Sequence, residues 1–86
     1  MASFEVRWKN SAAKDLRSLD QQMKSRVLQM VGELANQPFP QGVRKLVGSE
    51  HTYRIQVGDY RIIYSVEQAV LIIEILRVRH RREVYR

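Results

Sequence analysis

The last ten residues, RVRHRREVYR (77–86), hold the densest group of side chains in the sequence that could bind an anion or transfer a proton. Five of them are arginines, and His80 and Tyr85 stand among these. A buried strand could not accommodate so many guanidinium groups, and Val78 and Val84 are placed too regularly for a solvated tail. So much positive charge suggests a polyanionic partner, either nucleic acid or an acidic protein segment, with a frayed basic tail as the alternative.

A second basic group belongs to a predicted β-hairpin. Residues 52–57 and 60–66 have strand-like patterns and flank Gly58 and Asp59, which suit a tight two-residue turn. Because side chains alternate between the faces of a sheet, such a turn decides which residues of the two strands share a face.

This register puts Arg54, Gln56 and Arg61 on one face of the hairpin. The other face would carry residues that helices could cover, namely Tyr53, Ile55, Val57, Tyr60, Ile62 and Tyr64. A solvated sheet face is the simplest interpretation of the arginines. The strand leading into residues 77–86 brings more arginines to the same region, however, and two such groups repel each other unless an anion lies between them. Phosphate is the obvious candidate for this anion, because the planar guanidinium matches it well.

The rest of the chain must hold these side chains in place. Residues 4–8 alternate apolar and polar side chains and predict a first strand. Asn10 or Ser11 can cap a helix, and Asp20 can cap a second, longer helix. The apolar residues of the second helix recur at helical spacing, and they are Met23, Val27, Met30, Val31 and Leu34.

Strands dominate the chain after a proline-containing loop at residues 36–42. Residues 44–48 are a short strand candidate. Residues 70–78 are apolar on both faces apart from Glu74 and, near the end, Arg77, which is typical of a central strand. The predicted fold is therefore α+β, with a two-helix hairpin packed on one face of a small, mostly antiparallel sheet of four to five strands.

Composition narrows the class of protein. A chain of 86 residues makes a single domain, 1–86, with one modest core. Fifteen lysines and arginines against nine acidic residues give a net charge of +6, which again suggests a polyanionic partner. With no cysteine and only two histidines, the sequence offers no recognisable metal site and fits a reducing cytoplasm. It contains no apolar stretch suited to a signal peptide or a membrane span.

Taken in order, several motifs resemble those of one family. KLVG (45–48), YRIQVGDYRIIY (53–64) and an apolar strand ending in RVRHRREVY (77–85) resemble the RelE/ParE superfamily of bacterial toxin–antitoxin systems, and the RelE branch most closely. The resemblance covers nearly the whole chain. It implies a RelE-like fold and a small basic ribonuclease that cuts messenger RNA in the ribosomal A site and is silenced by a cognate antitoxin.

The resemblance also implies functional residues. Matched motif by motif, the catalytic side chains are Arg54, Arg61, Arg81 and Tyr85, and related toxins use a histidine near the tyrosine, which here is His80. The expected RNA-binding residues are Lys45, Gln56, Arg77, Arg79 and Arg82. Two of these depart from the family pattern, since Gln56 stands where well-studied members carry a lysine and Arg79 where a glycine is common.

RNA cleavage without a metal suits these groups. The 2′-oxygen attacks the adjacent phosphorus, which requires a base, a stabilised phosphorane and a proton for the 5′-leaving oxygen. Arg61, in mid-strand, is expected to stabilise the phosphorane, with Arg54 adding charge. Tyr85 can act as the base if the cations lower its pKa from about 10, or it can stack on a nucleobase or pack at the C-terminus. Arg81 would lie by the leaving group, and His80 is the alternative acid or base.

The expected function is that of a type II toxin, a ribosome-dependent endoribonuclease that needs no metal or other cofactor. The alternative is a ParE-like toxin of the same fold that inhibits DNA gyrase without nuclease chemistry. The implied partners are a RelB-like antitoxin, the ribosome and messenger RNA in the cytoplasm, with operator DNA bound through the antitoxin. A basic nucleic-acid-binding domain with no toxin role would leave the REVY ending (82–85) unexplained.

Overall fold

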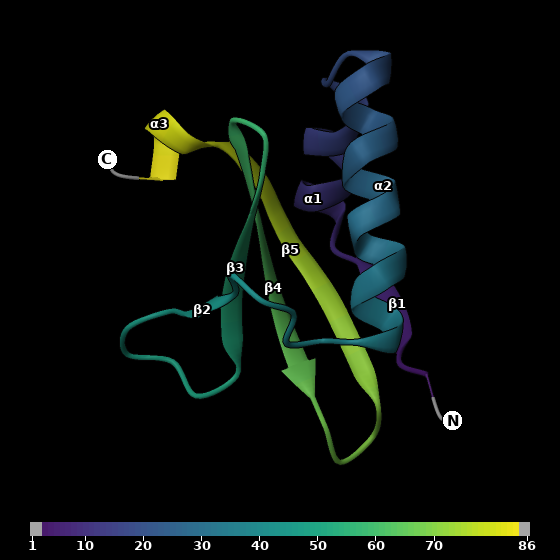
Figure 1. The fold of residues 1–86 in the computed structure, drawn as a ribbon, viewed down its shortest axis with the longest axis vertical. Coiled ribbons are helices and arrows are strands. Elements are labelled where there is room, and N and C mark those ends of the chain that lie inside the picture. The colour runs from purple at the N-terminus through teal and green to yellow at the C-terminus, as the bar shows by residue number, and fades with distance from the viewer. Residues whose placement is uncertain (1–2, 85–86) are drawn as a thin grey trace.

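Two helices lie against one side of a five-stranded sheet in the computed structural model, which describes residues 3–84 (Figure 1). The strand order is β1-β5-β4-β3-β2; β1 pairs with β5 in parallel and the other pairs are antiparallel. The elements are β1 (Glu5–Trp8), α1 (Asn10–Arg17), α2 (Gln21–Asn36), β2 (Arg44–Lys45), β3 (Thr52–Val57), β4 (Tyr60–Glu67), β5 (Ile72–His80) and α3 (Arg81–Val84). This arrangement confirms the predicted α+β fold. In the part of the chain that the structure describes, no helix has the length and apolar character needed to cross a membrane.

The β3–β4 hairpin has the register that its two-residue turn predicts. Gln56 lies opposite Arg61. Gly58 has a φ of +59°, a conformation that glycine adopts without a steric penalty. A Cβ atom at Gly58 would come within 3.0 Å of two side chains of α2, so the turn packs closely against that helix.

The hydrophobic core fills the space between the helices and the sheet. It is formed by Ala12, Leu19, Val27, Val31 and Leu34 from the helical hairpin and by Ile55, Val57, Ile62, Tyr64, Val66, Ile73, Ile75 and Val78 from the strands. Tyr64 is fully buried, and its hydroxyl donates a hydrogen bond to the backbone oxygen of Pro38 at 2.8 Å. Burial, and to a smaller extent the neighbouring Tyr53, raises the pKa of Tyr64 above its ordinary value.

The two helices begin differently. Asp20 caps α2 as predicted, because its Oδ1 accepts a hydrogen bond at 2.8 Å from a backbone amide in the first turn. The prediction that Asn10 or Ser11 caps α1 is wrong, since α1 begins after Lys9 without a side-chain cap. The Ser11 hydroxyl instead donates to the backbone oxygen of Leu76 at 2.9 Å and satisfies an acceptor on β5.

β2 is shorter than predicted, and β5 is displaced along the chain from its predicted position. β2 covers only Arg44–Lys45 of the predicted 44–48. β5 starts later than residue 70, because the turn before it extends through Leu71, whose φ is +56°. Its other end runs on to His80. Its register with β4 also shifts between Ile63 and Tyr64, which marks a β-bulge.

Candidate functional site

The face of the sheet that is turned away from α1 and α2, called here the open face, carries the predicted arginines. Arg54, Gln56 and Arg61 line one shallow hollow of about 70 Å³ together with Gly42 and Arg44. We call this the arginine hollow. The helices cover the other side of the same strands (Figure 1), so the hollow is separated from the core by the sheet itself.

Arg44 is the charged member of this hollow that the sequence alone did not reveal. It pairs with Arg54 across the β2–β3 ladder, whereas Lys45 pairs with Tyr53. Tyr53 packs against the core on the helix side, so Lys45 belongs to the face opposite the arginine hollow. The sequence could have indicated only that one of the two consecutive residues Arg44 and Lys45, and not both, shares a face with Arg54. The RNA-binding role of Lys45 stays a prediction.

Three guanidinium groups around one hollow create a concentrated positive potential. Arg54 and Arg61 are only partly exposed, and Nη1 of Arg61 is buried. The side-chain amide of Gln56 donates to the backbone oxygen of Gly58 at 2.9 Å, which ties this neutral group to the hairpin turn. Fixed, partly desolvated donors of one sign can bind a phosphate group and stabilise negative charge that develops on it.

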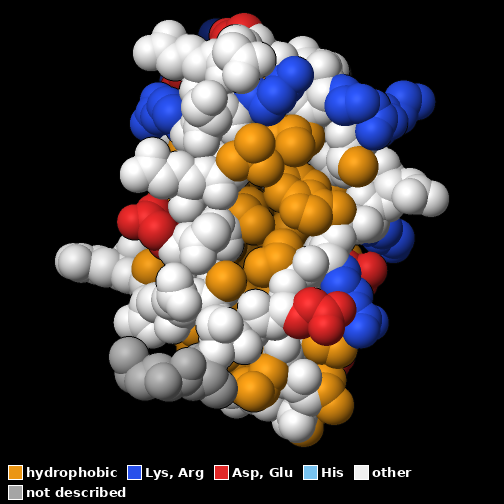
Figure 2. All heavy atoms as spheres, turned by 90° about the vertical axis from the view of Figure 1, so that its right-hand side faces the viewer, with side chains coloured by type: hydrophobic (Ala, Val, Ile, Leu, Met, Phe, Trp, Pro, Cys, Tyr) orange, Lys and Arg blue, Asp and Glu red, His pale blue; other side chains and the backbone are white. Residues whose placement is uncertain are grey.

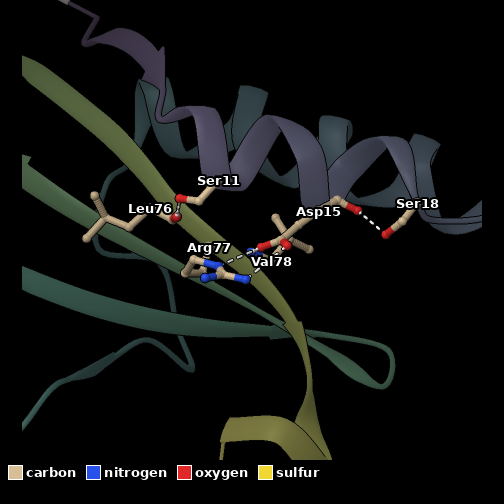
Figure 3. A network of polar contacts seen from close by, with 6 residues as sticks. All are labelled: Ser11, Asp15, Ser18, Leu76, Arg77 and Val78. Carbon is tan, nitrogen blue, oxygen red and sulfur yellow. Dashed lines mark hydrogen bonds and ion pairs between the residues drawn. The ribbon is translucent and has the colours of Figure 1, made fainter.

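The C-terminal half of β5 turns toward α1. Nε and Nη2 of Arg77 donate to Oδ2 and Oδ1 of Asp15 at 2.9 and 3.2 Å (Figure 3). Arg79 lies in register with Arg61 but lines a second, larger hollow of about 300 Å³, called here the edge hollow. The edge hollow is lined by Asp15, Ser18, Leu19, Tyr60, Arg77, Val78, Arg79 and His80. The RNA-binding roles of Arg77 and Arg79 stay predictions.

His80 lies on the helix side of the sheet. It pairs with Tyr60, which packs against the core, and the two rings meet edge to face with centroids 5.3 Å apart. Its Nδ1 accepts a hydrogen bond at 3.3 Å from the backbone amide of Arg82. The structure therefore does not bring His80 together with Arg54 and Arg61.

The short helix α3 leads the chain past the hairpin turn. The backbone amide of Arg81 donates to the backbone oxygen of Asp59 at 2.8 Å. Figure 1 shows α3 on the side of the sheet opposite α1 and α2. Arg81 and Arg82, the first two residues of α3, are exposed, and they therefore lie on the same side of the sheet as the arginine hollow. Tyr85 lies outside the described residues.

Comparison with known proteins shows which family the chain belongs to. The family model described as the ParE toxin of type II toxin–antitoxin systems matches residues 6–85. The chain belongs to this family. The toxin is also 31% identical over 87 residues to toxin RelG of Mycobacterium tuberculosis, an alignment that covers 96% of the toxin and 97% of RelG.

Solved structures share the fold of the toxin. A chain of the archaeal RelE–RelB complex from Pyrococcus horikoshii superposes with a TM-score of 0.83 and 33% identity, covering 92% of the toxin and 96% of that chain. The isolated RelE toxin of E. coli gives a TM-score of 0.79 and 25% identity, with 98% and 92% covered. These likenesses confirm the predicted RelE/ParE superfamily and its fold.

In this toxin the predicted site is brought together in part. Arg54, Gln56 and Arg61 meet in the arginine hollow, Arg44 joins them from β2, and His80 faces the opposite side of the sheet. The family match includes the whole hollow and continues through the C-terminal segment.

Proposed function

We propose that the toxin is a metal-independent endoribonuclease that cleaves messenger RNA in the ribosomal A site and so inhibits translation. The arginine hollow carries this proposal, because Arg44, Arg54 and Arg61 gather like charges around one concavity. Opposed like charges destabilise a free sheet, whereas a bound phosphodiester neutralises them and accepts their hydrogen bonds. The names of the relatives RelG and RelE support the RelE type of activity.

In the proposed reaction the scissile phosphate lies in the arginine hollow. Arg61 stabilises the phosphorane, because β4 is held between β3 and β5 and fixes the origin of this side chain. Arg54 and Arg44 add positive charge from the neighbouring strands. Cations that are already in place need no reorganisation as negative charge develops in the transition state.

Proton transfer is assigned to the C-terminal segment. Tyr85 accepts the proton of the attacking 2′-hydroxyl, and Arg81 lies near the 5′-leaving oxygen, where its positive charge stabilises the departing oxyanion until solvent water protonates it. His80 is the alternative acid or base. We rank it below Tyr85, because its ring lies against Tyr60 on the helix side, whereas the arginine hollow is on the open face.

The remaining basic residues extend the proposed RNA-binding surface. Gln56 lines the hollow itself, and Arg82 is exposed at the start of α3. Lys45, Arg77 and Arg79 add positive charge around the sheet edges. Together with the net charge of +6, they attract the phosphate backbone of the message and of the ribosome.

We propose a RelB-like antitoxin as the partner that silences the toxin, as the archaeal RelE relative is solved with RelB. Figure 2 shows the helix side with a band of hydrophobic side chains down its middle and Lys and Arg side chains toward its top. Leu28 of α2 is 48% exposed. An amphipathic antitoxin segment with acidic residues would cover both features. The complex would bind operator DNA through the antitoxin, and the toxin would act in the cytoplasm.

One experiment tests the proposed activity directly. Purified toxin is added to a translating extract, and the 5′ ends of the message are mapped. Cuts at A-site codons are the expected result. Arg61→Ala serves as the impaired variant, and Arg17→Ala, which removes an exposed arginine of α1, is the matched control that should cleave normally. An intact message together with stalled DNA gyrase would instead identify the ParE-like activity.

A further inference from the structure

The outer edge of β5 has a strand beside it along only part of its length. The parallel pair with β1 ends where Trp8 meets Ile75, and the chain then turns into α1. Beyond this point polar side chains of α1 replace the missing strand (Figure 3). The Ser11 hydroxyl donates to the backbone oxygen of Leu76 at 2.9 Å, and Oδ2 of Asp15 accepts from the backbone amide of Val78 at 3.0 Å.

Asp15 has a second contact at the same place. Its carboxylate accepts two hydrogen bonds from the guanidinium of Arg77, at 2.9 and 3.2 Å. The Asp15 side chain is only 17% exposed, while that of Arg77 is 40% exposed. One largely buried carboxylate thus holds the backbone of Val78 and the side chain of Arg77, two consecutive residues of β5.

These two residues directly follow the β-bulge. Tyr64 of β4 pairs with Ile75 and Ile63 pairs with Arg77, so Leu76 is skipped. Because one residue is skipped, the side chains of β5 that follow the bulge point to the opposite faces from those that simple alternation would give them. Val78 is buried and Arg79 is in register with Arg61, whereas an unbulged strand would turn Arg77 and Arg79 toward the core.

We propose that Asp15 is a positioning residue that locks this bulge and thereby sets the face on which the arginine-rich C-terminal segment leaves the sheet. By holding Val78, Asp15 keeps Arg79 beside Arg61 and fixes the start of α3, where Arg81 bonds to Asp59. The effect on catalysis rests on the proposed ribonuclease function. The effect of Asp15 on the bulge is independent of that function.

The test compares three variants with the parent toxin. Asp15→Ala removes both contacts, and Asp15→Asn keeps an acceptor for the amide of Val78. Asp20→Ala is the matched control, because Asp20 is also a carboxylate that accepts a backbone hydrogen bond, but its donor is the amide of Met23 in α2 and not an amide of β5. Three quantities are measured in each variant: the amide hydrogen exchange of Val78 relative to Ile73, and the kcat and the KM of message cleavage.

Asp15→Ala should speed exchange at Val78 relative to Ile73 by about 10–100-fold, which corresponds to the loss of a charge-assisted hydrogen bond. It should lower kcat by roughly 10–100-fold with a smaller change in KM, because displaced catalytic groups affect the reaction step. Asp15→Asn should recover part of both losses, and Asp20→Ala should show neither.

Unchanged relative exchange at Val78 in a folded Asp15→Ala toxin would overturn the proposal. So would faster exchange with a kcat equal to that of Asp20→Ala. If the parent toxin cleaves no message, the proposed function fails, and the exchange comparison then decides by itself whether Asp15 locks the bulge.

Discussion

Arg44 of β2 and Arg54 of β3 lie directly opposite each other on the open face of the sheet. Like charges at opposed positions destabilise an antiparallel pair by about 0.2–1 kcal/mol. Arg61 enters the same hollow from β4. β2 is only two residues long, so we expect this repulsion to weaken its pairing with β3 and a bound anion to relieve it.

Phosphate should therefore stabilise the free toxin more than chloride does at equal ionic strength. Arg44→Gln should raise Tm in low-salt chloride, by the equivalent of at most about 1 kcal/mol, and should lose most of the phosphate effect. Lys45→Gln is the matched control, because it removes the same charge from the other face. Thermal unfolding followed by circular dichroism measures both effects. An equal phosphate response in the two variants would contradict an anion site at the hollow.

The hairpin shows what the sequence could predict. Gly58 and Asp59 leave one favourable register for the strands that they join, so the shared face of Arg54 and Arg61 follows from the turn. β2 and β3 are joined instead by residues 46–51, and a loop of this length permits several registers. The choice of Arg44 over Lys45 for the hollow therefore required the structure.

The faces of β5 were not predictable, for a different reason. The bulge that turns Val78 inward is held by Asp15, which lies 63 residues away from it in the sequence. The alternation of polar and apolar residues along β5 does not indicate a contact with a residue so far away in the sequence. His80 consequently lies on the helix side, although the sequence suggested that the whole C-terminal segment converges on the hairpin arginines.

Replacing Arg61 should impair chemistry more than folding. If its guanidinium stabilises the phosphorane, Arg61→Ala should slow single-turnover cleavage by roughly 10²–10³-fold, as the loss of one preorganised donor does in other enzymes. The side chain faces away from the core, so the free energy of unfolding should change little. Single-turnover kinetics and urea unfolding measure the two quantities. A folded Arg61→Ala toxin that cleaves at the parental rate would exclude this role.

Ribosome binding should weaken steeply as salt rises, because lysine and arginine contacts to phosphates release counterions. Arg44→Gln and Arg54→Gln should each reduce the slope of log affinity against log salt by about 1 if each side chain contacts one phosphate. Arg17→Gln should leave the slope unchanged. Cosedimentation with ribosomes over a salt series gives these slopes. A flat response of the parent toxin would mean that the open face does not bind RNA.

Tyr64 leads to a prediction about pH. Its hydroxyl is buried, and burial raises its pKa above the ordinary value near 10. The unfolded chain ionises this group near pH 10 while the folded chain keeps it protonated, so the stabilisation is complete below that pH and is lost as pH rises above it. Tyr64→Phe should cost about 1 kcal/mol at neutral pH, since the oxygen of Pro38 loses its donor.

The pH dependence separates this effect from simple packing, because phenylalanine keeps the ring. Between about pH 9 and pH 11, the free energy of unfolding should fall less in Tyr64→Phe than in the parent toxin. Urea unfolding at several pH values in this range measures the difference. Parallel declines in the two proteins would show that Tyr64 does not ionise on unfolding as proposed.

The C-terminal segment carries the last prediction. A toxin truncated after His80 loses Arg81, Tyr85 and the contact between Arg81 and Asp59, but it keeps every strand of the sheet and both large helices. It should fold with reduced stability and should be inactive. Growth of cells that express it measures toxicity, and 5′-end mapping measures cleavage. A folded truncation that still cuts message at the A site would show that the arginine-rich ending is not catalytic.

Two substitutions at Tyr85 then separate proton transfer from stacking. Tyr85→Phe removes only the hydroxyl, so a base role predicts that it cleaves as poorly as Tyr85→Ala, with a loss of roughly 10²–10⁴-fold in single-turnover rate. A stacking role predicts that Tyr85→Phe cleaves like the parent while Tyr85→Ala fails, because only the aromatic surface matters. In that second case His80 would become the leading candidate for the base. Since its ring now lies against Tyr60 on the helix side, His80→Ala would then have to abolish cleavage, and the end of β5 that carries His80 would have to move when RNA binds.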